Sequence, residues 1–563
     1  MGPGAVVAEV TGSARNPPAE VTGSARTPGE TTGSVRTAAQ EEPTGAAQLR
    51  GAARHGVANL AGVAVAAAAA FALNIVVTRG WSVLDAGLFF AGTSAFMIAY
   101  AAARLGTGVG SVYFVSRARA LGQPERIRPA VLAGAVPVAL VGTGLGIAGW
   151  VLAPALAGVL FRDPTPDAVP MLRSLALFLP VAALGEMALA ACRGFGRMGP
   201  LLLVDRLGRH GLQLVAVALA AVLGASVATG LPLAWALPYL PATVIALGWL
   251  ALLVRRAERA AAGARPRPVR LAWEYWRYTG PRALGSLAQM TVQRLDIVLL
   301  AALRGSAEAA VYTAATRFLT LGQLSAQALA TAVQHRIAGQ MARGDRAAVG
   351  RLYQATTGWL VLLAWPAYLL FAVFAEAVLA LFGPGYGSGR TVTVVLALTM
   401  LLATGCGMVD SVLNMAGKTS WTFYNALAAV AVNVVGNLLL IPPYGMVGAA
   451  AAWSAAIAVG NLVPLAQLYG SMRLHPFGRG TLLAAALATV CFGLPPLLAR
   501  LVYGANLPVL AAVAAAGALA YAAGAWRWRS VLQLDALRAA VRRPRGDRSG
   551  GLHDVPNAAG EGA

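Results

Sequence analysis

The sequence predicts an all-α polytopic membrane protein with about fourteen transmembrane helices. Hydrophobic residues make up 58% of the 563 residues, and charged residues make up only 12%. A soluble globular chain has about 45–50% apolar residues, so a soluble enzyme of this length is excluded. The apolar residues are gathered into runs of about 20, the length of helix that crosses a hydrocarbon core of about 30 Å.

The apolar runs begin after residue 54 and are separated by polar loops. We predict spans at 56–78, 84–104, 130–152, 171–192, 200–223, 231–253, 280–302, 307–333, 355–381, 392–415, 420–441, 445–469, 481–500 and 506–525. Helix-breaking residues within or beside these spans are expected to bend helices where the backbone lines a cavity. They are Pro180, Pro366, Pro464, Pro496 and the glycine-rich segment 105–110.

The basic residues supply an independent test of these spans. Lys and Arg number 44 against 22 Asp and Glu, a net charge of +22. With the N-terminus in the cytoplasm, the basic clusters all fall in the loops on that side, as the positive-inside rule requires. They lie at 50–54, 104–128, 193–197, 255–277, 336–351, 418, 473–479 and 538–548. Both termini are therefore predicted to be cytoplasmic, with the charge facing anionic membrane lipids and no nucleic-acid partner.

The polar ends of the chain are predicted to lie outside the membrane. Residues 1–54 contain three TGSAR-type repeats, at 9–15, 20–26 and 30–36, and are too polar to bury a core. We therefore predict a disordered cytoplasmic tail there and a basic cytoplasmic tail at 526–563. Lys418 is the only lysine, an arginine bias typical of GC-rich bacterial genomes, so we expect a bacterial cytoplasmic (inner) membrane.

Enzymatic chemistry is not supported. No external loop is long enough to hold an acid–base pair, and the chain lacks a Walker A sequence, an HExxH motif and a nucleophile elbow. Cys192, Cys406 and Cys491 lie far apart without metal-ligand spacing. We predict a transporter rather than an enzyme, with no catalytic residue, no cofactor and no metal site.

Ionisable side chains inside the spans are the candidate functional residues, because each is costly in hydrocarbon. The seventh span carries Arg282, Arg294 and Asp296, and the eighth carries Arg317 at a depth similar to that of Asp296. An Asp296–Arg317 pair is expected, either at a substrate site or as a buried structural salt bridge. Arg294 and Asp296 lie about 200° apart around the helix, so they cannot face the same partner.

A second group is Glu186 on the fourth span with Arg206 and Arg209 on the fifth, again with structural helix pairing as the alternative. Asp410 on the tenth span is a candidate cavity-lining acid, whereas His210 is interpreted as an interfacial or packed histidine. Arginine exceeds acid in these spans. That excess suits an anionic substrate, because guanidinium matches phosphate oxygens in bidentate geometry.

Several strings occur in an order and spacing that resemble a known family. They are 293–305 (QRLDIVLLAALRG), 310–317 (AVYTAATR), 381–386 (LFGPGY), 413–418 (LNMAGK), 440–450 (LIPPYGMVGAA) and 192–200 (CRGFGRMGP). They resemble the polysaccharide and oligosaccharide flippases of the multidrug/oligosaccharidyl-lipid/polysaccharide exporter superfamily. The resemblance is strongest over about 280–470.

The resemblance implies two six-helix bundles related by a pseudo-twofold, plus two C-terminal helices, around a cationic central cavity. The bundles would span 55–254 and 279–470, joined by a basic amphipathic connector at 255–278 and followed by the additional helices at 471–525. The family-like acid falls on Asp296 and the family-like arginine on Arg317. Arg282 and Arg294 would supply further positive charge for a pyrophosphate.

The resemblance also implies a substrate and partners. Such proteins flip polyprenyl-pyrophosphate-linked oligosaccharide by alternating access, for cell-surface polysaccharide and lipopolysaccharide biosynthesis. Membrane lipids and other polysaccharide-assembly proteins are the implied partners. Two alternatives stay open: a cation-coupled multidrug exporter of the same superfamily, and a membrane scaffold or enzyme of glycan assembly that transports nothing.

Overall fold

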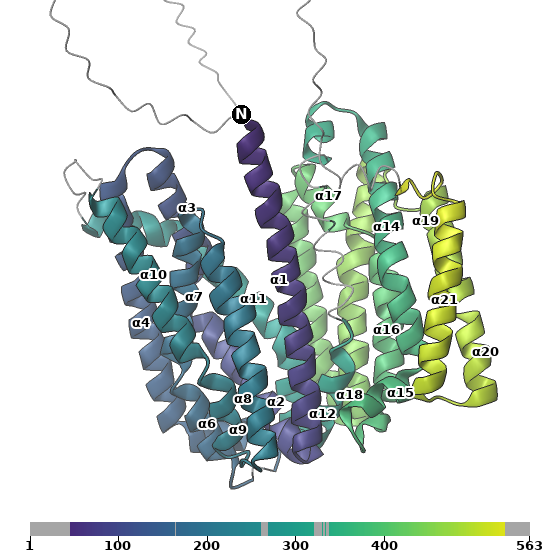
Figure 1. The fold of residues 1–563 in the computed structure, drawn as a ribbon, viewed down its shortest axis with the longest axis horizontal. Helices are drawn as coiled ribbons and strands as arrows, with labels where there is room; N and C mark the ends of the chain where they lie inside the picture. Colours follow the sequence, from purple (N-terminus) through teal and green to yellow (C-terminus); the bar gives the residue numbers. More distant parts are fainter. Residues whose placement is uncertain are drawn as a thin grey trace, which may run out of the picture. The chain divides into compact units, whose positions relative to one another are not determined.

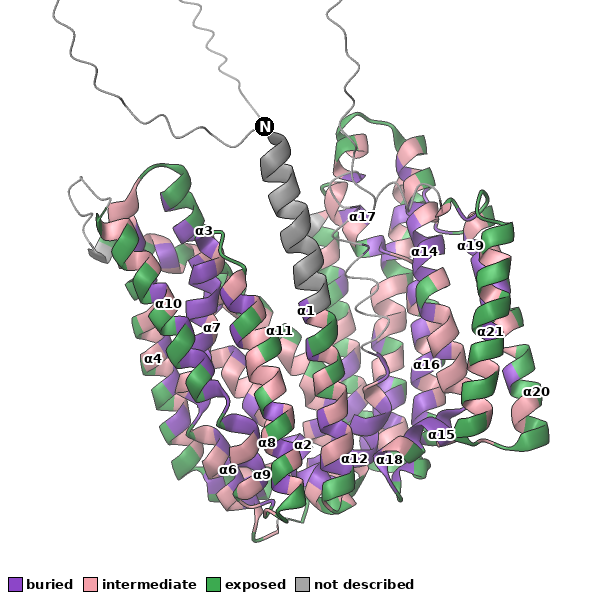
Figure 2. Cartoon of the chain, in the orientation of Figure 1, coloured by how far each residue is buried: buried purple, intermediate pink, exposed green. Residues whose placement is uncertain are grey.

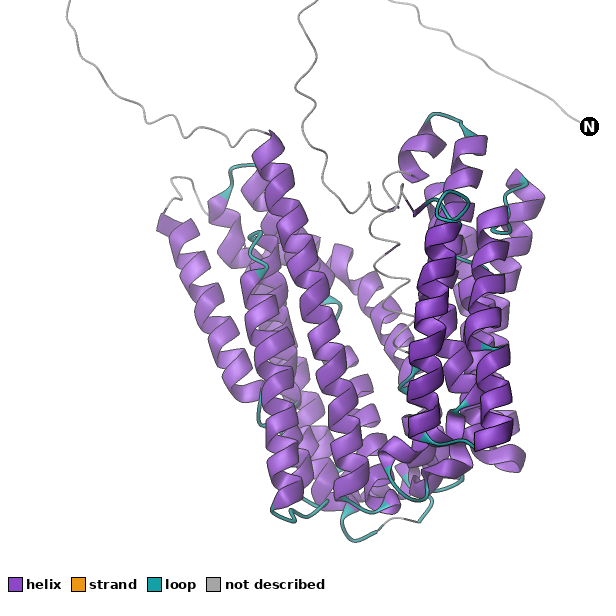
Figure 3. Cartoon of the chain, turned by 45° about the vertical axis from the view of Figure 1, so that its right-hand side comes forward, coloured by secondary structure: helices purple, strands orange, loops and turns teal. Residues whose placement is uncertain are grey.

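The structure is a computed structural model that describes residues 45–163, 165–259, 268–319, 329, 333 and 337–534. Its side chains are described from residue 62 onward, apart from 268, 269 and 419. Within these ranges the chain consists of helices and loops without a strand (Figure 3), which confirms the all-α prediction. Residues 54–563 form one compact unit and residues 1–53 another. Of the tails predicted at 1–54 and 526–563, residues 1–44 and 535–563 lie outside the described residues, whereas 45–54 belong to the first helix and 526–534 are described as the end of the last helix and turns.

The first half of the chain forms the helices shown in purple to teal in Figure 1. They are α1 (Gly45–Gly80), α2 (Val83–Ala103), α3 (Thr107–Ala120), η1 (Pro124–Arg126), α4 (Ile127–Val151), α5 (Ala153–Leu160), α6 (Ala168–Ala176), α7 (Leu179–Gly194), η2 (Leu201–Arg209), α8 (His210–Val222), α9 (Gly230–Ala236) and α10 (Tyr239–Arg259).

The second half begins with a long helix that includes the end of the predicted connector. Its helices are α11 (Pro268–Leu303), α12 (Ser306–Thr316), α14 (Arg346–Val373), α15 (Ala375–Leu379), η3 (Ala380–Phe382), η4 (Tyr386–Gly389), α16 (Arg390–Gly405), α17 (Val409–Met415), α18 (Thr419–Met472), α19 (Arg479–Phe492), α20 (Leu494–Tyr503) and α21 (Leu507–Arg527).

Eleven helices of the described chain are long and apolar enough to cross a membrane. They coincide with predicted spans, but two other predicted spans are not among the eleven. The span at 200–223 consists of η2 followed by α8, and the span at 307–333 is described continuously only to residue 319. One of the eleven, α18, covers two predicted spans. The count of fourteen stays a prediction.

The helix α18 doubles back at Gly445, whose φ of 56° and ψ of −135° interrupt the helical backbone. The positive φ there suits a residue without a Cβ. Across the two arms, the side-chain amides of Asn425 and Gln467 exchange hydrogen bonds of 2.7 and 3.0 Å. The arms are the predicted spans at 420–441 and 445–469, packed as an antiparallel pair.

Three of the five predicted helix breakers lie where the chain turns or where a helix begins. The chain turns at Leu105 and Gly106, both with positive φ, between α2 and α3. Pro180 and Pro496 lie at the starts of α7 and α20, where proline leaves no helical hydrogen bond unmade. Pro366 and Pro464 lie inside helices that continue past them.

Small residues allow close helix packing around α7, which contacts α3, α4 and α10. In a bilayer, packing depends on such close approach because lipid offers no hydrophobic drive. The buried side of α7 includes Ala182, Ala183, Gly185, Ala188 and Ala191. Figure 2 shows α7 mostly buried and α21 mostly exposed, as expected for a helix whose surface faces lipid.

The helix α11 joins both halves of the chain. It packs against α2, α3 and α4 from the first half and against α12 and α18 from the second. Near its start, Tyr275 is fully buried and its hydroxyl lies 2.9 Å from the Ser111 hydroxyl. The Trp276 indole donates to the Ala133 carbonyl at 3.1 Å, whereas Trp273 is 69% exposed. The amphipathic connector therefore docks one face on α3 and α4.

Candidate functional site: a cationic cavity

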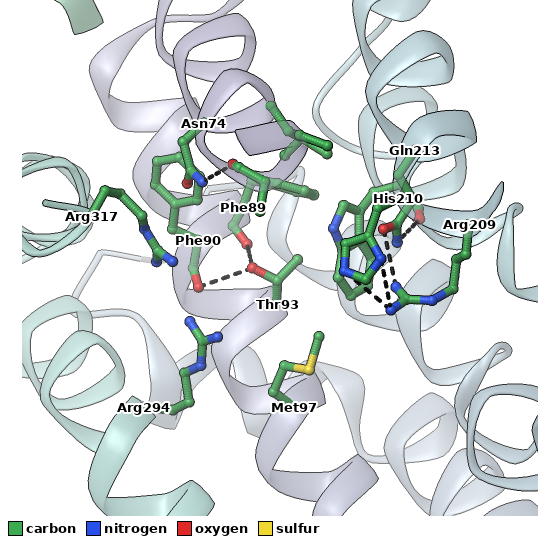
Figure 4. A pocket seen from close by; sticks show the side chains of 14 residues that line it. Asn74, Phe89, Phe90, Thr93, Met97, Arg209, His210, Gln213, Arg294 and Arg317 are labelled. Atoms are coloured by element: carbon green, nitrogen blue, oxygen red, sulfur yellow. Dashed lines mark hydrogen bonds between the residues drawn. The ribbon is translucent and has the colours of Figure 1, made fainter. Parts of the chain in front are cut away.

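A cavity of about 190 Å³ lies among α1, α2, η2, α8, α9, α11 and the end of α12. Figure 4 shows its polar residues, which come from both halves of the chain. They are Asn74, Thr93, Arg209, His210, Gln213, Arg294 and Arg317, and the apolar lining is Ala69, Ala70, Leu73, Phe89, Phe90, Met97 and Trp235. Three of these fourteen residues are arginines and none is an acid, so the cavity is cationic.

Two of the arginines come from the second half of the chain. Arg294 lies on α11, and Arg317 follows directly after α12. Figure 4 shows both guanidinium groups directed into the cavity beside Phe90. Two like charges in one cavity repel each other, and an anion bound between them removes that repulsion. The Nε atom of Arg294 is buried and, within the described structure, has no hydrogen-bond partner.

The third arginine, Arg209, is held by several neighbours. Its Nε donates to Asp205 Oδ1 at 2.7 Å, and its Nη1 donates to Gln213 Oε1 at 3.1 Å. Its Nη2 lies 3.3 Å from His210 Nε2, and the guanidinium lies 4.7 Å from the centre of the Tyr239 ring. These contacts fix the position of the group and neutralise much of its charge.

The expected Asp296–Arg317 pair is wrong. Asp296 is 4% exposed and accepts hydrogen bonds from the Tyr312 hydroxyl at 3.1 Å and from Asn437 Nδ2 at 2.7 Å. Arg317 instead lines the cavity with Arg294. The predicted angular separation explains this arrangement: Arg294 and Asp296 lie on different sides of α11, one toward the cavity and the other toward α12 and α18.

The second expected group is only partly brought together. Glu186 pairs with Arg193 at 3.4 Å rather than with the arginines of the fifth span. Arg206 and Arg209 share Asp205 instead, at 3.9 and 2.7 Å. Asp205 was not predicted as a partner, although its spacing of four residues from Arg209 is that of a helical ion pair.

Arg282 and Asp410 lie outside the cavity lining. Arg282 is exposed, donates to the Tyr278 carbonyl at 2.6 Å and sits 3.7 Å from the centre of the Tyr278 ring. Asp410 is exposed in the first turn of α17.

Three neutral polar residues that line the cavity, Asn74, Thr93 and Gln213, were not predicted. Asn74 stands alone in an apolar run, a signal that could have identified it, whereas Thr93 is followed by another small polar residue and Gln213 lies close to the charged end of η2. His210, interpreted as a packed or interfacial residue, packs on Arg209 and also lines the cavity. Among the described residues, no cluster of His, Cys, Asp and Glu could hold a metal ion.

Some of the contacts between the two halves lie where α1, α5 and α11 end. The Arg79 guanidinium, at the end of α1, donates to the carbonyls of Leu381 and Ala380 at 2.7 and 3.2 Å. The Arg162 guanidinium donates to the Leu303 carbonyl at 3.2 Å. This is the side of the chain that the loop charges predict to be external.

Comparisons with known proteins match the chain to transporters and flippases. Residues 281–439 match the MatE family model. The probable flippase AglR of Haloferax volcanii is 24% identical over 216 residues, which are 37% of this chain and 45% of AglR. The chain thus aligns with less than half of that relative.

Two solved structures share the fold. The lipid II flippase MurJ, in an inward closed conformation, matches with a TM-score of 0.65 and 10% identity over 85% of this chain and 99% of MurJ. An inward-facing multidrug resistance MATE family transporter of the MOP superfamily matches with a TM-score of 0.59 and 16% identity, over 72% of this chain and 93% of the transporter. Residues 281–439 are thus similar to MatE proteins, and the chain has the fold of a lipid II flippase and of a multidrug transporter of the multidrug/oligosaccharidyl-lipid/polysaccharide exporter (MOP) superfamily.

Proposed function

We propose that the protein is a flippase that moves polyprenyl-pyrophosphate-linked oligosaccharide across the bacterial cytoplasmic membrane for cell-surface polysaccharide biosynthesis. The observation that carries this proposal is the cavity lined by Arg209, Arg294 and Arg317 without an acid. Guanidinium groups match phosphate oxygens in charge and geometry. A diphosphate would neutralise this cavity, whereas an organic cation would be repelled from it. The matches to AglR and MurJ, both flippases by name, are consistent with this substrate class.

The size of the cavity allows it to receive the diphosphate of the substrate. About 190 Å³ is open to the centres of water-sized groups, and on that measure one water needs only about 10–15 Å³. The cavity therefore has room for a diphosphate together with ordered waters, and we assign this part of the substrate to it.

Alternating access also gives the contacts at the predicted external side a role. Arg79 and Arg162 bind carbonyl groups of the second half of the chain there. These hydrogen bonds would have to break before the cavity could open outward. With both termini cytoplasmic, as the loop charges predict, the present contacts would close the external side.

A cation-coupled multidrug exporter is the second candidate, favoured by the MatE match and by Asp296, a buried acid within a span. Reconstitution separates the two functions. The full chain would be placed in vesicles with a fluorescent polyprenyl-pyrophosphate-linked glycan, and transfer followed by a quencher that cannot cross the membrane. Parallel vesicles would contain ethidium under an imposed proton or sodium gradient.

Each outcome decides between the candidates. Glycan transfer that is lost in Arg294→Ala supports the flippase. Ethidium movement driven by an ion gradient, without glycan transfer, supports the exporter. If the protein moves neither compound although it is folded in the vesicles, a scaffold or glycan-assembly role replaces both transport functions.

A further inference from the structure

The fifth predicted span contains an unusual helix. Residues Leu201–Arg209 form the π-helix η2, in which backbone N–H groups bond to the carbonyl five residues earlier. At its end the His210 N–H bonds to the Asp205 carbonyl. Such helices are rare and often occur at functional sites. Here the segment ends at Arg209, the cavity arginine contributed by the first half of the chain.

Gly208 allows the π-helical hydrogen-bond pattern because it has no Cβ. A Cβ at Gly208 would lie 2.8 Å from the Leu203 carbonyl oxygen, a backbone atom five residues earlier. Real Cβ atoms essentially never approach an oxygen so closely, so a side chain at this position forces the turn to shift. By contrast, a Cβ at Gly211, three residues later, would meet nothing within 4 Å.

His210 links the same turn to Arg209. Its Nδ1 lies 2.9 Å from the Asp205 carbonyl oxygen, which can only accept a hydrogen bond, so Nδ1 carries the proton and donates. The Arg209 Nη2 lies 3.3 Å from the other ring nitrogen, Nε2, which then has a lone pair, and 3.4 Å from Nδ1, so the guanidinium packs against the imidazole. A single neutral imidazole thus ties the π-helical carbonyl to the guanidinium in the cavity.

We propose that Gly208 and His210 are positioning residues for the diphosphate of the substrate, because they hold the π-helical turn that keeps the Arg209 guanidinium at the cavity wall. This inference rests on the proposed function for the identity of the ligand. In an α-helical register the Asp205 carbonyl would bond to the Arg209 N–H instead of to His210. This change shifts the hydrogen-bond pattern by one residue, and it rotates the helix after the segment by about 100° relative to the helix before it.

The first experiment measures binding of inorganic pyrophosphate to the purified full chain in lipid nanodiscs by calorimetry. Gly208→Ala and His210→Ala are expected to weaken binding about tenfold, the size expected from misplacing one charge-assisted contact. The matched control Gly211→Ala should bind like the wild type. His210→Asn, whose amide can donate to the Asp205 carbonyl, should restore most of the affinity.

The second experiment reports the helix register without a ligand. Spin labels at Met198→Cys and Leu219→Cys, both on exposed positions, flank the segment in a background without the three native cysteines. A rotation of about 100° on a helix some 10 Å wide should shift the distance between labels by about 5 Å. We expect this shift in Gly208→Ala and His210→Ala but not in Gly211→Ala.

The two measurements distinguish failure of the inference from failure of the proposed function. Wild-type affinity in both Gly208→Ala and His210→Ala overturns the inference. If the wild type does not bind pyrophosphate, the proposed diphosphate site is overturned, and the spin-label distance alone decides whether Gly208 and His210 hold the register. An unchanged distance in both variants overturns that part as well.

Discussion

The two sides of the cavity present their arginines in different ways. On the side of η2 and α8, Arg209 is bound by Asp205, Gln213 and His210. On the side of α11, Arg294 faces the cavity with no acid among the lining residues and with a buried Nε that has no partner in the described structure. One guanidinium is fixed and largely neutralised, and the other keeps its charge.

The difference between a paired and an unpaired arginine explains how the site can bind a ligand tightly and still release it. A buried cation without a counter-ion is unstable, and an arriving anion relieves that cost. Arg294 should therefore supply most of the attraction for a diphosphate. Arg209, whose charge is already balanced, should supply oriented donors at little ordering cost.

The largest effect is expected from Arg294. We predict that Arg294→Ala lowers glycan transfer about 100-fold while membrane insertion stays intact, because two charge-assisted hydrogen bonds of about 1.5 kcal/mol each are lost. Arg317→Ala is expected to do the same. The effect is measured as transfer of the glycan into the quencher-accessible leaflet of reconstituted vesicles. Arg294→Lys keeps the positive charge but not the bidentate guanidinium, so its transfer rate should lie between those of the wild type and Arg294→Ala.

Folding must be separated from binding in this comparison. Elution as a single species and a melting temperature no lower than that of the wild type would show that Arg294→Ala is folded. Transfer at the wild-type rate by such a protein would show that the charge of Arg294 does not attract the substrate, and the contrast between the two sides would lose its functional meaning.

The next effect concerns Asp205, which holds Arg209. Asp205→Asn removes the charge at the 2.7 Å contact with Arg209 Nε but keeps an oxygen and the side-chain size. We predict about a tenfold loss of pyrophosphate affinity, because Arg209 becomes mobile. Calorimetry measures it. Tighter binding would instead mean that Asp205 competes with the ligand for Arg209, so that Arg209 attracts the anion as Arg294 does.

The sequence predicted the helices better than the partners of their charges. Each apolar run carries its own length, so the spans could be placed one at a time. Partners, by contrast, depend on rotation about each helix axis and on helices far apart in the chain. Their similar depth in the membrane, from the helical rise per residue, predicted that Asp296 lies beside Arg317. The contact of Asp296 with Asn437, 141 residues away, could not be predicted from depth alone.

The fifth span shows a second reason why side-chain positions could not be predicted from the sequence. The depth and direction of each side chain were expected from an α-helix, with a rise of 1.5 Å and a turn of 100° per residue throughout the span. The π-helix at Leu201–Arg209 departs from both, which changes the faces that Arg206 and Arg209 present. The arginine content of the cavity was nevertheless predictable, because charged side chains stand out in an apolar run.

A smaller effect, on stability, is expected from Asp296. Tyr312 and Asn437 bind this acid from α12 and α18, so it joins three helices on the side of α11 away from the cavity. We predict that Tyr312→Phe lowers the free energy of unfolding by about 1 kcal/mol, the usual size of a hydrogen bond between membrane helices. Denaturant unfolding in micelles measures it, and pyrophosphate affinity should not change.

Affinity and stability measurements together distinguish the two sides of α11. Arg294→Ala should lower affinity without lowering stability, and Tyr312→Phe should lower stability without lowering affinity. If Tyr312→Phe weakened pyrophosphate binding tenfold while leaving stability alone, Asp296 and its neighbours would belong to the binding site, and the two sides of α11 would not have separate roles.

The smallest effect is expected from Arg282, on the same helix as Arg294 but outside the cavity. Its guanidinium is exposed, lies on the Tyr278 ring and donates to the Tyr278 carbonyl, so its charge is screened by solvent and headgroups. We predict that Arg282→Ala changes glycan transfer less than about twofold, since exposed contacts contribute at most a few tenths of a kcal/mol. A loss as large as that of Arg294→Ala would show that the substrate also contacts α11 well before the cavity. The attraction would then be distributed along the helix and not concentrated opposite Arg209.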